Sequence, residues 1–373
     1  MNMQHAVEER YSEGARMRAT ELCCPVDYAP ELLQILPQEI IERDYGCGDP
    51  SRYVLEGDTI LDLGSGGGKV CYMAAQLAGE NGYVIGVDMN DAMLALARKY
   101  QDEMAQKLGG ERVAFRKGYI QDLALDVEAL EQWLAQHPVT DISSLEALEQ
   151  WQQEQRRNNP MIPDGSVDLV ISNCVLNLVE DRYKQDMVAE IFRVLKPGGR
   201  IAISDIVSDE PVPQHLKEDG ELWSGCISGA FLEHQLLEVF YAAGFQGICF
   251  NQWSSEPWRV VDGIEFRSVT ITAIKGEGGP CLDKGHAVIY RGPFSHVRDD
   301  AGNDYPRGQR IAVCERTFRM LTDAPYRECF IGITPGAERA AVPWCSPAGT
   351  MRPPHETKSG VHTGATSGSS CCG

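Results

Sequence analysis

The chain has 373 residues, a formal charge of -20 at pH 7 and 13 cysteines. Its length exceeds that of a usual single hydrophobic core, which predicts one main domain with appendages. The acidic field would repel phosphate backbones and anionic lipid head groups, so we expect no nucleic acid and no membrane among the partners.

The N-terminus is polar and acidic, and no uncharged apolar run approaches the roughly 18 residues that a membrane span requires. We therefore expect a cytoplasmic protein. In a reducing compartment, an odd number of unevenly spaced cysteines indicates free thiols, metal or metalloid ligands, or catalytic redox pairs rather than a disulfide scaffold.

Residues 1–57 show a helical pattern that prolines interrupt. This pattern predicts an N-terminal cap over the cofactor edge of a larger domain. The cap carries Cys23 and Cys24 side by side in a turn, and Cys47 in the sequence YGCG.

Strand and helix signals then alternate through residues 58–277, from TILDLG and YVIGVD to VDLVISNCV and RIAISDI. Such alternation predicts an α/β fold with a doubly wound parallel sheet, which two later strand-like runs complete to seven strands. The segment 124–160 interrupts the pattern and contains EALEQW twice. We expect two short amphipathic helices there, with a capping box at Ser143 and Glu146. We favour a surface feature without a role in catalysis over an active-site lid.

Glycine and proline become frequent after this domain. Short strand-like runs, HAVIYRG and IAVCERTF, predict a small β-rich appendage over residues 278–342. The tail 343–373 is rich in serine, threonine, glycine and proline and should be disordered, because it cannot bury enough apolar area to offset its chain entropy. It carries Cys345, Cys371 and Cys372.

The strongest cofactor signal is ILDLGSGGGKV, a short apolar strand that runs into a glycine-rich turn. Backbone amides at Gly64, Gly66 and the intervening Ser65 could approach a nucleotide-like cofactor closely, because glycine has no Cβ. Asp88 follows about 20 residues later, at a strand end where a carboxylate accepts both ribose hydroxyls. The turn lacks the spacing GxGxxG, so it is more similar to class I S-adenosylmethionine methyltransferases than to nicotinamide enzymes, which remain the less favoured alternative.

Further residues complete this predicted cofactor site. Asp62 could hold the methionine amino group. Ile120 would form an apolar wall against adenine, with Gln121 as a backbone contact, and Asn173 would lie beside the transferable methyl group at the end of a strand. We add Tyr45 and Met89, which flank these motifs in YGCG and GVDM.

Three cysteines occupy places where a methyltransferase would hold a substrate. Cys174 follows the strand VDLVISN at its carboxyl end, where ligands gather in open sheets, and Cys47 and Cys226 lie in turns of small residues. Their pattern indicates methylation of a thiol-bound atom, with residues 211–230 contributing to the site. Zinc is the alternative atom that these three cysteines could bind, but the chain contains no C-x-x-C pair of the kind typical of zinc sites. The cysteines at 71, 249 and 314 fall in apolar stretches and are expected to pack as small hydrophobic residues.

The motifs YGCG, ILDLGSGGGKVCYMAAQLAG, GVDM, SNCVLNLV, RVLKPGG, ISDI and LWSGCISGA together resemble the arsenite methyltransferase family. The resemblance implies a class I methyltransferase, Rossmann-like fold in which S-adenosylmethionine methylates arsenic(III) held by the thiolates of Cys47, Cys174 and Cys226. It also implies that Cys23 or Cys24 relays a disulfide to Cys47, and that thioredoxin or glutathione restores the thiols. The expected substrate is arsenite or its glutathione adduct, and the expected state is a monomer.

Two other classes stay open. The same cofactor site would serve a methyltransferase for selenium, tellurium or an organic thiol, which substrate-dependent methyl transfer would identify. A non-catalytic metalloid-binding or sensing protein would trap arsenic without binding S-adenosylmethionine.

Overall fold

The computed structural model describes residues 3–17, 26–337 and 339–358. Cys23, Cys24, Cys371 and Cys372 lie outside this described part, so the structure does not address their predicted roles. The chain divides into two compact units, Met1–Gly276 and Glu277–Gly373. Among the described residues, no helix has both the length and the apolar character that a membrane crossing needs.

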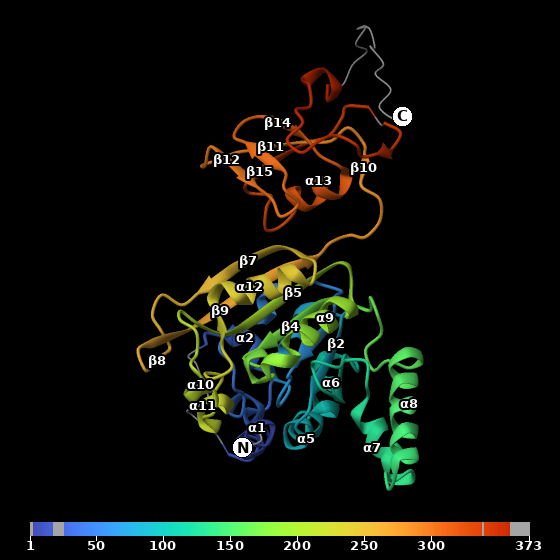
Figure 1. Ribbon diagram of the computed structural model, residues 1–373, viewed down its shortest axis with the longest axis vertical. Coiled ribbons are helices and arrows are strands. Elements are labelled where there is room, and N and C mark those ends of the chain that lie inside the picture. The colour runs from blue at the N-terminus through green and yellow to red at the C-terminus, as the bar shows by residue number, and fades with distance from the viewer. Residues whose placement is uncertain (1–2, 18–25, 338, 359–373) are drawn as a thin grey trace. The chain divides into compact units, whose positions relative to one another are not determined.

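A mixed sheet forms the centre of the first unit (Figure 1). Its main strands are β1 (Thr59–Leu63), β2 (Tyr83–Asp88), β3 (Val113–Lys117), β4 (Val167–Asn173), β5 (Leu195–Ser208), β7 (Phe245–Trp253) and β9 (Ile264–Lys275). Their order is β3-β2-β1-β4-β5-β9-β7. The first five are parallel, and β9 pairs antiparallel with both β5 and β7. Short strands β6 (Phe231–Leu232) and β8 (Arg259–Val261) pair with the ends of β5 and β9, respectively. The predicted α/β methyltransferase fold is therefore confirmed.

Helices cover both faces of this sheet. One face packs against α4 (Lys69–Ala78), α5 (Asp91–Lys99) and α6 (Gln101–Leu108), and the other against α9 (Lys184–Val194) and α12 (Glu233–Ala242). Along β4, Leu169 and Ile171 join the first cluster while Val170 joins the second. Burial on both faces explains why this strand reads as a continuous apolar run rather than an alternating one.

The interrupting segment forms α7 (Val127–Gln136) and α8 (Ile142–Asn158). Trp133 and Trp151, the last residues of the two EALEQW strings, stack with ring centroids 5.4 Å apart. The repeats therefore pair with each other. The predicted capping box was wrong by two residues: Asp141 accepts a hydrogen bond from Ser144 N at 2.7 Å, and Ser144 Oγ accepts one from Asp141 N at 3.0 Å. Because α8 begins at Ile142, Ser143 lies inside the helix and cannot cap it.

The described residues of the second unit form three small sheets, one α-helix of about two turns and a short 3-10 helix at Pro354–Glu356. Strand β11 (Ala287–Tyr290) lies between β14 (Arg310–Ala312) and β15 (Phe330–Ile333), while β10 (Leu282–Asp283) pairs with β16 (Val342–Pro343) and β12 (His296–Arg298) with β13 (Asp304–Pro306). The run IAVCERTF is only half a strand, because α13 (Glu315–Thr322) begins directly after Cys314.

Two expectations about this unit were wrong. Cys314 does not simply pack as a small hydrophobic residue: it forms a disulfide with Cys281, across a Cα–Cα distance of 5.6 Å. The tail is ordered through residue 358 rather than disordered from residue 343. The buried Arg352 explains this order, because its guanidinium forms ion pairs with Asp283 at 2.8 Å and with Glu356 at 3.0 Å. Residues 359–373 lie outside the described part.

Candidate active site

A pocket opens where the glycine-rich turn after β1 meets the ends of β2 and β4. All of the residues predicted from the sequence to contact a cofactor line it: Tyr45, Asp62, Gly64, Ser65, Gly66, Asp88, Met89, Ile120, Gln121 and Asn173. Cys174 lines the same pocket. The structure thus brings the predicted cofactor residues together and places one predicted substrate thiol beside them.

The glycine-rich turn and Asp88 hold each other in place. Gly64 has a φ of +68°, and a Cβ at this position would collide with Val175. The turn then directs Gly66 N to Asp88 Oδ2 at 2.8 Å, while Asn90 N donates to Asp88 Oδ1 at 2.8 Å. Burial raises the pKa of Asp88, and these backbone donors partly oppose that rise. The carboxylate is therefore held in one orientation within the pocket.

Two further groups in the pocket suit a polar ligand. Ser65 Oγ is buried and has no hydrogen-bond partner within the described residues, which is unusual for a hydroxyl in a folded protein. Asp62 is buried and accepts a hydrogen bond from the Cys71 thiol at 3.1 Å. Burial raises the pKa of Asp62 to about 7, with Cys71 lowering it and nearby carboxylates raising it. A cationic group would stabilise the ionised form of this carboxyl.

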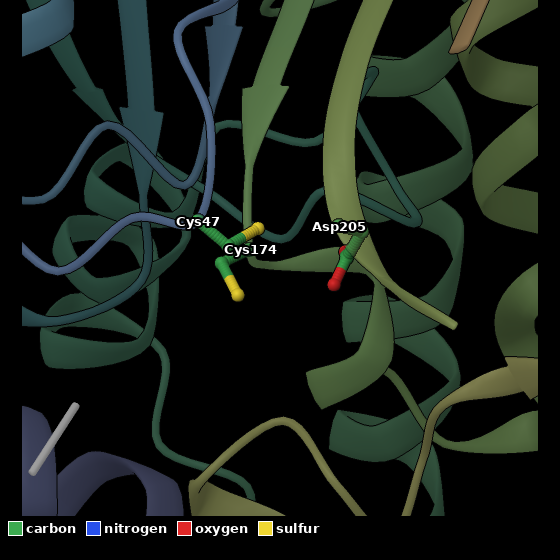
Figure 2. Close-up of side chains that lie close together, drawn as sticks. All are labelled: Cys47, Cys174 and Asp205. Atoms are coloured by element: carbon green, nitrogen blue, oxygen red, sulfur yellow. The ribbon is translucent and has the colours of Figure 1, made fainter. Parts of the chain in front are cut away.

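The three predicted substrate thiols lie together in a buried apolar cluster, the thiol cluster. Cys47, Cys174 and Cys226 are all buried among Ile206, Leu216, Ile227, Ile264 and Phe266. The Cys226 thiol donates to the Cys174 carbonyl at 3.1 Å. The sulfurs of Cys47 and Cys174 and a carboxylate oxygen of Asp205 all lie within 4.8 Å of one another (Figure 2). Since Cys174 also lines the cofactor pocket, the two sites adjoin.

Two of the thiol residues have an uncommon backbone conformation. Cys174 has a φ of +63° and Cys226 a φ of +61°, in the left-handed region that costs a non-glycine residue energy. Hydrogen bonds hold both turns. Asn177 Nδ2 donates to the carbonyl of Ile206 at 2.7 Å and to that of Cys226 at 3.3 Å. The surrounding structure therefore fixes where these thiols point.

The loop that carries Cys47 is attached to Asn173 at the end of β4. Asn173 Oδ1 accepts hydrogen bonds from Cys47 N at 2.9 Å and Gly48 N at 3.1 Å, and its Nδ2 donates to Gly48 O at 2.8 Å. A Cβ on Gly46 would collide with the Asn173 side chain, and one on Gly48 with Ser204. The glycines of YGCG therefore allow the loop to approach the sheet edge closely.

The environment of the cluster disfavours charged thiolates when no ligand is bound. For Cys174, contact with Cys226 lowers the pKa, but contact with Cys47, burial and the charge of Asp205 raise it well above the usual value overall. Contact with Cys174, burial and Asp205 likewise raise the pKa of Cys226. The site is suited to a ligand that binds sulfur without leaving net charge behind.

Sequence reasoning missed two parts of this site, the first being the side chains that the predicted N-terminal cap contributes to it. Helix α1 (Met3–Gly14) contacts both the cofactor pocket and the thiol cluster through Tyr11. This residue lines the pocket, and its hydroxyl lies 4.0 Å from the Cys226 sulfur. Arg10 donates to the carbonyl of Glu221 at 2.8 Å, in the segment before Cys226. The second missed part is Asp205, which is almost fully buried at 1% exposure. A carboxylate inside the apolar run RIAISDI was the available signal.

Comparisons with known proteins agree with this geometry. A family model described as a methyltransferase domain matches residues 55–137 and 139–244, and one described as a domain of unknown function matches residues 277–362. The arsenite methyltransferase of Aquipseudomonas alcaligenes is 33% identical over 336 residues, which cover 83% of this chain and 84% of that protein. The human arsenite methyltransferase is 31% identical over 314 residues, covering 81% of this chain and 74% of that protein.

A solved structure gives the same result in three dimensions. The crystal structure of an arsenic(III) S-adenosylmethionine methyltransferase from Chlamydomonas reinhardtii matches with a TM-score of 0.57 and 27% identity, over 87% of this chain and all of that one. Both the sequence and the fold thus match over most of the chain, which belongs to the arsenite methyltransferase family.

Proposed function

We propose that this protein transfers methyl groups from S-adenosylmethionine to arsenic(III) bound by the thiolates of Cys47, Cys174 and Cys226. The observation that carries the proposal is the convergence of these three thiols, from segments far apart in the sequence, beside a pocket lined by every predicted cofactor residue. Family membership supports the same activity.

The residues in the pocket fit the cofactor. Asp88 would accept the ribose hydroxyls, Asp62 would pair with the methionine ammonium, and the orphaned hydroxyl of Ser65 would gain a polar partner. Ile120 and Gln121 would contact the adenine. When bound, S-adenosylmethionine supplies an electrophilic methyl group carried on a sulfonium.

Arsenic binding can proceed without charging the apolar cluster. Three thiols and arsenous acid give a neutral trithiolate and three waters, because each departing hydroxide takes up one thiol proton. With a glutathione adduct the departing glutathione thiolates take up those protons instead. The raised pKa values of Cys174 and Cys226 are therefore no obstacle, since the protons leave with the displaced ligands. The neutral product also matches the apolar wall formed by residues such as Ile227 and Phe266.

The thiol site then positions the nucleophile. Arsenic held by three sulfurs keeps a lone pair, and Cys174 belongs to both the thiol cluster and the cofactor pocket, so the lone pair can face that pocket. Orientation of this kind accounts for about 7 to 11 kcal/mol of barrier reduction in favourable cases. No general base is needed, because the reacting arsenic carries no proton.

Completion of the cycle requires two electrons, because arsenic becomes formally pentavalent on methylation. We propose that oxidation of Cys47 together with Cys23 or Cys24 to a disulfide supplies these two electrons, and that thioredoxin or glutathione then reduces the disulfide back to thiols. Both N-terminal cysteines lie outside the described residues, so their role stays a prediction. A monomeric state and a cytoplasmic location also stay predictions.

Transfer of labelled methyl from S-adenosylmethionine to arsenite, with glutathione present, tests the function. The intact protein should methylate arsenite, and the Cys174→Ser and Cys226→Ser variants should lose this activity. Cys249→Ser is a matched control on β7, outside the cluster, and should behave as the intact protein. Full activity of Cys174→Ser would contradict the thiolate site.

The alternatives give different outcomes in the same assay. Transfer to selenite, tellurite or an organic thiol, with none to arsenite, would identify another thiophilic substrate. Arsenic binding without S-adenosylmethionine binding would identify a non-catalytic metalloid-binding protein.

A further inference from the structure

The carboxylate of Asp205 lies within the thiol cluster but outside the cofactor pocket. One of its oxygens is within 4.8 Å of the sulfurs of Cys47 and Cys174, and Asp205 is not among the residues that line the pocket (Figure 2). The three side chains come from the YGCG loop, the end of β4 and the interior of β5. An atom bound by these two sulfurs would therefore lie close to the Asp205 carboxylate.

The carboxylate is held rigidly and is not neutralised by a direct ion pair. Leu176 N donates to Asp205 Oδ2 at 2.9 Å, and Ile206 N donates to Oδ1 at 2.8 Å. No lysine, arginine or histidine in the described part of the chain forms a salt bridge with Asp205; the nearby Lys184 instead pairs with Asp181 at 2.7 Å and donates to Gly229 O at 2.7 Å. Backbone donors thus orient the negative charge without cancelling it.

Methyl transfer changes the charge at the place that Asp205 faces. The arsenic lone pair forms an arsenic–carbon bond while the carbon–sulfur bond of the cofactor breaks, and the electron pair of that bond stays on the sulfur. The product sulfur is neutral, and a unit positive charge now resides on the arsenic. The total charge is conserved, but it has moved from the cofactor pocket into the thiol cluster.

From these observations we infer that Asp205 is a catalytic residue whose negative charge stabilises the positive charge that develops on thiol-bound arsenic during methyl transfer. The inference rests on the proposed function. An interaction that is stronger in the transition state than in the ground state accelerates the reaction. The neutral arsenic trithiolate gains little from a nearby carboxylate, whereas the developing arsonium gains much, and the apolar surroundings of the cluster leave that attraction poorly screened.

The same placement argues against two simpler roles for Asp205. As an arsenic ligand it would compete with three sulfurs, which a thiophilic element prefers. As a proton acceptor it would be superfluous, since displaced hydroxide or glutathione takes up the thiol protons. A fixed charge at this position is instead useful at the methyl-transfer step itself.

The test is single-turnover methyl transfer by the full chain with arsenic(III) bound beforehand, in Asp205→Asn and Asp205→Glu. The Asn variant keeps the size and one acceptor oxygen but removes the charge, and its transfer rate should fall about 10²-fold. Its arsenite affinity, measured separately, should change by no more than about threefold, because neutral trithiolate formation does not use the charge. The Glu variant should recover part of the rate. Asp209→Asn, which removes an exposed charge directly after β5, is the matched control and should transfer at the normal rate.

A wild-type transfer rate in Asp205→Asn would overturn the inference. So would a loss of arsenite affinity that equals the loss of rate and is not rescued by Glu, because a structural role predicts that pattern. If the Asn variant does not fold, Asp205→Ser keeps a hydroxyl acceptor for a backbone amide and is judged by the same criteria. Absence of methyl transfer by the intact protein would overturn the proposed function and the inference together, whereas a normal rate in intact protein and in the uncharged variant would overturn the inference alone.

Discussion

The side chain of Asn173 holds the backbone of Cys47 in place, because its Oδ1 accepts a hydrogen bond from Cys47 N at 2.9 Å. The same asparagine lines the cofactor pocket, so one side chain connects the position of a substrate thiol to the cofactor site. This connection explains why an asparagine, with both a donor and an acceptor, stands at the end of β4.

Replacing Asn173 with alanine should therefore displace the Cys47 loop. We expect the free energy of unfolding to fall by about 1–3 kcal/mol, because the amides of Cys47 and Gly48 lose a buried acceptor. Methyl transfer to arsenite should fall about 10- to 100-fold, since small misplacements of a nucleophile are costly. Denaturant unfolding and labelled methyl transfer measure the two effects. Asn158→Ala, at the exposed end of α8, is the control and should leave transfer unchanged.

Cofactor binding should depend on pH through Asp62. Burial raises the pKa of this carboxyl to about 7. Below that pH it is protonated and cannot pair with the methionine ammonium, so affinity for S-adenosylhomocysteine should rise with pH, by at most about tenfold per unit, and level off above the pKa. Calorimetric titration across this range measures the slope. Asp62→Asn should bind weakly at all pH values with no such slope, and a slope that persists in this variant would assign it to another group.

The raised pKa of Asp62 also has a consequence for stability. The folded protein binds this proton more tightly than the unfolded chain does, so the stabilisation is present at acidic pH and is lost as pH rises through about 7. In the absence of cofactor, Asp62→Asn should therefore reduce the decline of the free energy of unfolding between acidic and neutral pH. Denaturant unfolding of both proteins at a series of pH values measures this difference.

The sequence predicted those parts of the site that short motifs encode. The glycine turn, Asp88 and the thiol of Cys174 each follow a buried strand, and parallel strands bring their carboxyl ends to one edge. Asp205 was missed because its importance depends on two thiols that approach it only in the folded chain. Pairing of Cys281 with Cys314 was missed for the same reason, since nothing local links residues separated by 33 positions.

Arg10 should keep α1 closed over the thiol cluster. Its guanidinium donates to the Glu221 carbonyl at 2.8 Å and to Ser224 Oγ at 3.0 Å, directly before Cys226. In Arg10→Gln we expect faster hydrogen exchange in residues 220–226 and a severalfold lower rate of arsenite methylation, because water gains access to the site. Arg16→Gln removes an exposed charge just beyond α1 and should change neither. Unchanged exchange in Arg10→Gln would show that α1 closes without this contact.

The disulfide between Cys281 and Cys314 should stabilise the second unit alone. It closes a segment of the chain with a sequence separation of 33 residues, for which the loss of chain entropy in the unfolded state corresponds to about 3–4 kcal/mol. Reduction, or the double change Cys281→Ser and Cys314→Ser, should therefore lower the unfolding temperature of this unit. The first unit should be unaffected, because both cysteines belong to Glu277–Gly373.

Hydrogen exchange measured as a function of denaturant reports the two units separately. The exposed Cys329 lies in the same unit, and Cys329→Ser is the matched control that should leave its stability unchanged. Equal destabilisation of both units would contradict this prediction, because it would mean that they unfold as one.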